Sequence, residues 1–304
     1  IRRAVGEDAL LYGEAWDLTD LPGHQATTKG NMPPEARLAA FSDSTRDAYA
    51  GRMQASGFAQ GEPWGLPKVR AGIVGNLRDF GGPGISDDPY DRFAREPGET
   101  LNYLSIHDGF TLWDKINLSV KGDEAEKARI AKLAMAMLFT SQGRIILHGG
   151  DEMGRIKPLC ANDPSPDRAH TSGVVEESRE LPGVRRFHEN SYASPDFTNM
   201  VRWGRLGREP FASMAAYLRD LIRMRAALPA LRFATSDQVR RGLRFIGGSD
   251  ATPTVGGGGY GSFSEIPRLT LEFVNGPRNT TCYLAGEVLP ADGDPDKNPK
   301  KNPF

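Results

Sequence analysis

The sequence has 304 residues, of which 38% are hydrophobic and 25% are charged, as in soluble globular proteins. Its formal charge of -1 argues against a general phosphate-binding surface, and therefore against nucleic acid as a partner. No apolar run approaches the roughly 18–20 residues of a membrane span, so we expect no membrane partner. Two cysteines are too few for a disulfide framework, which leaves both a cytoplasmic and a secreted location open.

Four short apolar runs are each followed by acidic or histidine residues, and we expect each run to form a buried strand. The runs cover 9–12, 38–41, 101–106 and 145–147. The residues that follow them are Glu14, Asp43, His107 with Asp108, and His148 with Asp151 and Glu152. Apolar residues at helical spacing predict helices over 123–139 and 212–228.

Alternating strands and helices predict a parallel α/β sheet, whose strands in a βα barrel all end at one mouth where active sites are built. Most of the strand ends are separated by about one βα unit of roughly 30 residues. The interval before the third strand is longer, and its Gly- and Pro-rich residues 57–98 predict a long loop. Four strands are half of an eight-stranded barrel, so we expect the other half to precede Ile1.

The domain prediction divides the chain after residue 235. Residues 1–235 are expected to form the C-terminal half of a (β/α)8 TIM barrel. Short apolar runs at 243–246, 269–274 and 281–284 alternate with turn residues and predict the start of a small antiparallel β domain over 236–304. Its polar residues from 289 onward are expected to be flexible.

Glu14 and Trp16 together indicate the chemistry that this mouth performs. Glycoside hydrolysis uses two carboxyl groups, one of which must stay protonated to donate to the leaving oxygen. A partly dry, aromatic-lined site raises the pKa of such a carboxyl group. Glu14 follows a strand and has Trp16 beside it, so we predict that Glu14 is a general acid and that Trp16 stacks on a sugar ring.

The residues at the strand ends resemble the alpha-amylase superfamily, in its debranching branch. Residues 11–17 resemble the fifth-strand motif, 41–48 the sixth-strand region, 101–114 the seventh-strand motif and 149–152 the eighth-strand motif. Residues 190–203 resemble a sugar-contacting segment. The His107–Asp108 pair followed by Thr-Leu-Trp-Asp is most similar to type I pullulanases, with isoamylase-like enzymes next.

This resemblance implies a role for each matching residue and a reaction for the whole site. Glu14 matches the general acid/base, and Asp108 matches the Asp that stabilises the distorted transition state. Three residues are implied to contact substrate: His107, Asn190 and Tyr192, in addition to Trp16. The implied reaction is retaining hydrolysis of alpha-1,6 branch linkages in pullulan, amylopectin or limit dextrins, so the expected partner is an alpha-glucan.

The sequence also departs from the family pattern. The family's nucleophilic Asp lies on the fourth strand, but only thirteen residues precede Glu14, so we expect the chain alone to be inactive. Ala15 and Gly109 stand where pullulanases commonly have Gly and Asn, which leaves the subtype open. Two further alternatives also stay open, a catalytically silent glucan-binding fragment and a transglycosylating branching-type enzyme.

No cofactor is expected to be required. The resemblance allows a structural calcium ion, for which the sequence assigns no ligands. The candidate ligands His107, His148, Asp151 and Glu152 match no zinc motif in their spacing, so we predict no metal site.

Overall fold

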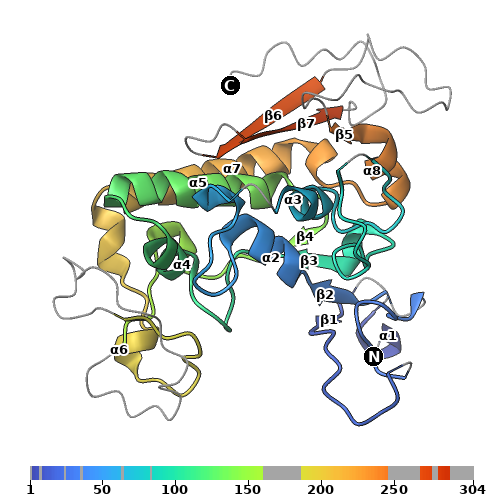
Figure 1. Ribbon diagram of the computed structural model, residues 1–304, viewed down its shortest axis with the longest axis horizontal. Coiled ribbons are helices and arrows are strands. Elements are labelled where there is room, and N and C mark those ends of the chain that lie inside the picture. Colours follow the sequence, from blue (N-terminus) through green and yellow to red (C-terminus); the bar gives the residue numbers. More distant parts are fainter. Residues whose placement is uncertain are drawn as a thin grey trace.

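The computed structural model describes residues 2–6, 9–23, 25–34, 37–62, 65–82, 84–159, 186–245, 268–275 and 280–287 (Figure 1). Within these ranges four strands form one parallel sheet in the order β1-β2-β3-β4. The strands are β1 (Tyr12–Gly13), β2 (Ala39–Phe41), β3 (Thr100–Asn102) and β4 (Arg144–Ile145). The predicted α/β class with a parallel sheet is confirmed, and all four strands end at the same edge.

Helices connect these strands and cover the sheet. The longer ones are α2 (Asp43–Ala50), α3 (Leu66–Ile73), α4 (Leu112–Ser119), α5 (Glu124–Thr140) and α7 (Phe211–Ala227). Short helices are α1 (Arg2–Val5), α6 (Asp196–Asn199) and α8 (Ser236–Gly242), and the 3-10 turns are η2 (Phe58–Gln60), η3 (Pro97–Glu99), η4 (Asp151–Met153), η6 (Trp203–Gly207) and η7 (Pro229–Leu231). No helix in the described ranges is both long and apolar enough to cross a membrane.

The two longest helices, α5 and α7, agree with the predicted ranges to within one residue at each end and lie side by side (Figure 1). Asp123 caps α5 because its carboxylate accepts the amide hydrogen of Glu126 at 2.8 Å. Buried residues of α5 recur at helical spacing: Ala128, Ala131, Ala134, Met135 and Leu138. The three alanines let α7 pack closely against α5. Met135 and Leu138 each stabilise the fold by about 1.5–3 kcal/mol through burial of their side chains.

The prediction that residues 9–12 form a buried strand is wrong. Leu10 is 42% exposed and Tyr12 is 54% exposed. Among the described strands β1 pairs only with β2, in the register Tyr12 to Ala39 and Gly13 to Ala40. The run therefore lies at the edge of the sheet, where one side has no covering strand.

The prediction of a long loop over 57–98 is also wrong, because α3 lies within it. Pro67 occupies the first turn of α3, where a helix tolerates proline. Gly72 lets α3 approach α2, since a Cβ atom at Gly72 would come within 2.7 Å of Thr45 Cγ2. Val69 and Ile73 are fully buried. The glycine and proline that suggested a loop therefore serve a helix instead, since Pro67 lies in the first turn of α3 and Gly72 lets this helix pack closely.

A second sheet contains β5 (Leu243–Phe245), β6 (Arg268–Asn275) and β7 (Thr280–Glu287). These strands are antiparallel, in the order β5-β7-β6. They coincide with the apolar runs noted in the sequence. The domain boundary after residue 235 stays a prediction, and the polar residues from 289 onward lie outside the described residues.

Candidate active site

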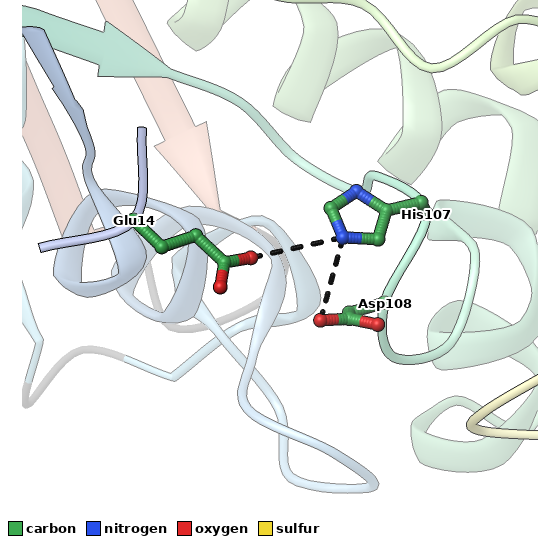
Figure 2. A group of neighbouring side chains, drawn as sticks. All are labelled: Glu14, His107 and Asp108. Atoms are coloured by element: carbon green, nitrogen blue, oxygen red, sulfur yellow. Dashed lines mark ion pairs between the residues drawn. The ribbon is translucent and has the colours of Figure 1, made fainter. Parts of the chain in front are cut away.

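Glu14, His107 and Asp108 come together at the carboxyl edge of the parallel sheet. Glu14 directly follows β1, and the other two lie in the loop after β3. Figure 2 shows both carboxylates facing the same nitrogen of the His107 imidazole. Its Nε2 atom lies 3.7 Å from Glu14 Oε1 and 3.5 Å from Asp108 Oδ2. Because β1 and β3 both flank β2, the sheet itself brings together residues that are distant in the sequence.

The three side chains are open to solvent, at 43%, 64% and 62% exposure for Glu14, His107 and Asp108. One ligand atom from each lies within 4.8 Å of the others, a spacing that a metal ion can bridge. Calcium takes about six to eight oxygen ligands, so two carboxylates and one imidazole do not fit it. As chemical groups, two carboxyl groups on one open rim can supply a proton donor and a negative charge, the pair of groups that glycoside hydrolysis uses.

Trp16 lies beside this cluster and is half-exposed. The centroid of its ring lies 6.1 Å from that of Tyr90, which is also half-exposed. The ammonium group of Lys29 lies 4.8 Å from the Trp16 ring and 4.3 Å from the Tyr90 ring. Two adjoining, half-exposed aromatic rings can stack on a sugar ring, and Trp16 follows Glu14 by two residues. Tyr90 could not be found from the sequence, because it belongs to residues 57–98.

Asp43 follows β2 but does not open onto the rim, contrary to the expectation for the strand ends. It is buried, forms an ion pair with Lys29 and accepts a hydrogen bond from the Tyr103 hydroxyl at 2.7 Å. Burial raises the pKa of the Tyr103 phenol, and Asp43 adds to that rise. Asp43 therefore lies beneath the rim and is engaged by Lys29 and Tyr103.

The residues after β4 also lie mostly below the rim. Asp151 is fully buried and accepts a hydrogen bond from the Ser105 hydroxyl at 2.6 Å. Burial raises the pKa of Asp151 to about 6. His148 Nδ1 lies 3.3 Å from the same hydroxyl, and burial lowers the pKa of His148 to about 4, with Arg155 adding to the effect. Glu152 accepts the amide hydrogen of Gly150 at 2.9 Å, so this group supports the rim.

Asn190 and Tyr192 lie on a separate segment, 186–192. Asn190 is partly exposed, and Tyr192 is 80% exposed. The described contacts do not join either side chain directly to Glu14 or Asp108. The segment is instead joined to the loop after β3 through Lys157, a residue that no motif in the sequence indicated.

The fold and the rim define an α/β protein with acidic side chains after its parallel strands. No model of a known protein family matches the chain. Its sequence is 31% identical over 242 residues to the pullulanase of Bacillus subtilis (strain 168), covering 78% of this chain. The resemblance to pullulanase-type debranching enzymes is thereby confirmed.

Solved structures of pullulanases also resemble this chain. A pullulanase from Paenibacillus barengoltzii in complex with maltohexaose and alpha-cyclodextrin is 31% identical, with a TM-score of 0.63 over 81% of this chain. The catalytic module of the glycogen-degrading pneumococcal protein SpuA has a TM-score of 0.65 at 21% identity, over 82% of this chain and 37% of its own, and shows the shared fold. The chain spans 28% of the Bacillus subtilis relative and 33% of the Paenibacillus structure.

Proposed function

We propose that this chain carries the acid/base side of the active site of a debranching glycoside hydrolase that cleaves alpha-1,6 linkages in alpha-glucans. One observation carries the proposal. Glu14 and Asp108 both lie close to the Nε2 atom of His107 at the carboxyl edge of a parallel sheet, in a chain that is 31% identical to a pullulanase. The proposed partner is an alpha-glucan, and the maltohexaose complex of the similar Paenibacillus protein supports that choice.

In the proposed reaction Glu14 gives its proton to the glycosidic oxygen as the bond to the sugar breaks. Asp108 stabilises the positive charge that develops on the sugar ring, and His107 orients Asp108 from 3.5 Å. A carboxylate nucleophile from outside this chain takes up the sugar. Glu14, now ionised, then removes a proton from water, which releases the sugar with its original configuration. Trp16, Asn190 and Tyr192 are proposed to contact the glucan.

The same proposal includes the architecture. We infer that the four parallel strands are half of an eight-stranded barrel and that the second sheet starts a β domain. The exposed edge of β1 supports the first point, because Tyr12 and Leu10 lack a covering neighbour there among the described residues. Such an edge is usually covered or paired in native proteins.

The test is Glu14→Gln in the longest polypeptide that contains this chain and releases reducing ends from pullulan. Loss of the proton donor should lower kcat by about 10²–10⁴-fold. The matched control is Glu124→Gln, because Glu124 is an exposed carboxylate on α5 that pairs with Arg208. Undiminished turnover by Glu14→Gln would exclude Glu14 as the acid/base.

Titration calorimetry with maltohexaose on the 304-residue chain separates the proposed function from the silent-binding alternative. Binding without release of reducing ends supports a binding role for the chain alone, whereas hydrolysis contradicts the view that its nucleophile comes from elsewhere. Analysis of product linkages separates debranching from branching activity, because only a branching enzyme creates new alpha-1,6 bonds.

A further inference from the structure

Lys157 is a buried lysine whose ammonium group joins two parts of the site. It is only 1% exposed and lies just after η4. Its Nζ atom donates hydrogen bonds to two backbone carbonyls, those of Gly109 and Glu189, the second at 2.8 Å. Gly109 directly follows the His107–Asp108 pair, and Glu189 directly precedes Asn190. One side chain therefore spans the two segments that carry the predicted substrate contacts.

The surroundings of Lys157 offset part of the cost of burying a charge. Burial lowers its pKa, and the carboxylate of Asp114 opposes that change most strongly, with smaller contributions from Asp108 and Glu189. Asp114 also accepts the backbone amide hydrogen of Lys157 at 3.1 Å. An ammonium group has three donors and no acceptor, so its place is set by the oxygens around it. The two carbonyls are consequently held at a fixed separation.

Each segment has further anchors, and both sides also contact the backbone of 155–158, through the Thr111 hydroxyl and the His188 amide. The loop 104–109 is held at its start by Lys115, whose Nζ donates to the Leu104 carbonyl at 2.9 Å. The segment 186–192 is held by a bridge between Pro158 and Phe187, and by the His188 amide, which donates to the Lys157 carbonyl at 2.8 Å. The Lys157 ammonium differs from these anchors in that it bonds a backbone carbonyl of each segment.

We propose that Lys157 is a positioning residue that fixes the separation between the loop of His107 and Asp108 and the segment of Asn190 and Tyr192. The glucan-binding consequence of this role rests on the proposed function. The link between the two segments does not, because it follows from backbone hydrogen bonds. Without the ammonium, the direct bond between the two segments is lost, their separation varies more, and a sugar chain that contacts both loses affinity.

The test compares Lys157→Met with Lys115→Met by hydrogen–deuterium exchange. Methionine keeps a long flexible stem but has no donor, and both changes remove one buried ammonium. Lys157→Met should accelerate exchange roughly tenfold in both 104–109 and 186–192, whereas Lys115→Met should affect only 104–109. Unchanged protection of 186–192 in Lys157→Met, or the same pattern in both variants, would overturn the proposal.

Two further measurements keep the outcome decisive. If Lys157→Met does not fold, exchange in the unmodified chain over a denaturant series decides, because tethered segments should open together with one free energy and independent ones should not. Lys157→Arg retains a charge and several donors, so it should restore protection in both segments, which a generally disruptive change would not allow.

Maltohexaose titration of the same variants addresses the site. If the parent chain binds, Lys157→Met should weaken affinity roughly tenfold and Lys157→Arg should recover most of it. Equal affinity of Lys157→Met and the parent would remove the positioning role. If the parent chain does not bind, the proposed function of this chain fails, while the exchange data still decide whether Lys157 links the segments.

Discussion

Lys29 forms a buried ion pair with Asp43 directly beneath the aromatic rings of Trp16 and Tyr90. Lys29 comes from the segment after β1, whereas Asp43 begins the helix after β2. The pair therefore ties the surroundings of Glu14 to the middle of the sheet. Tyr103, just after β3, donates to the same carboxylate and extends the connection to a third strand.

Replacing one partner of this pair should be costly. Lys29→Met leaves the Asp43 carboxylate buried without its main counter-charge, and we expect a loss of about 3–5 kcal/mol in the free energy of unfolding. Urea denaturation followed by circular dichroism measures it. The double variant Lys29→Met with Asp43→Asn should be more stable than Lys29→Met alone, since no charge is then stranded. A double variant at least as unstable as the single one contradicts this account.

Gly154 and Gly109 both have left-handed backbone conformations, with φ of 68° and 73°, but their surroundings differ. A Cβ atom at Gly154 would meet the Phe211 ring, 2.8 Å from Cδ1, whereas nothing lies within 4 Å at Gly109. Gly154→Ala should therefore cost roughly 2–4 kcal/mol through both strain and overlap. Gly109→Ala should cost about 1 kcal/mol from strain alone, and Gly109→Asn less, because Asn tolerates this conformation. Thermal unfolding of the three variants ranks them, and equal losses for the two Ala variants would refute the packing explanation.

Asp151 should make the native state less stable as pH rises. Burial raises its pKa from 3.8 to about 6, so the native state binds this proton more tightly than the unfolded state. The contribution is greatest below about pH 4 and is lost as pH rises through about 6, by roughly 2–3 kcal/mol. Asp151→Asn should remove this loss in denaturation curves at pH 4.5, 5.5 and 7. The exposed Asp220 on α7 provides the control, since Asp220→Asn should leave the profile unchanged.

His148 should make the native state less stable as pH falls, which is opposite to the effect of Asp151. Burial lowers its pKa from 6.5 to about 4, so protons bind the unfolded state more tightly and stability is lost as pH falls from about 6.5 through 4. His148→Gln should flatten this acid limb by about 2 kcal/mol. Measured together, Asp151→Asn should steepen the acid limb that His148→Gln flattens. Parallel profiles for both variants and the parent would show that neither group titrates as described.

Part of this site could be predicted from the sequence because parallel strands end at one edge of a sheet. That rule predicts that Glu14 lies near His107 and Asp108, and the distances in the structure agree with it. The same rule could not tell which strand-end residues are covered. Asp43 and Asp151 follow strands too, but they are buried and paired with Lys29 and Ser105. Lys29 lies outside every motif, and Ser105 lies within 101–114 but had no predicted role.

Other features depend on tertiary packing that local patterns do not encode. The glycine and proline content of 57–98 predicted a loop, yet Gly72 is the point where α3 packs against α2. Residues 9–12 are apolar enough for a buried strand, but burial depends on neighbours on both sides. Tyr90 and Lys157 reach the site through long-range contacts, so only the folded chain reveals them.

The short ladder between β1 and β2 has a consequence for catalysis. Glu14 follows a strand of two residues that is hydrogen-bonded on one side only among the described strands, whereas Asp108 follows a strand with neighbours on both sides. Glu14, the proposed proton donor, thus follows the less firmly held of the two strands. Any strand that came to pair with the free side of β1 would also immobilise Glu14, so completion of the sheet and acquisition of proton-transfer competence would be the same event.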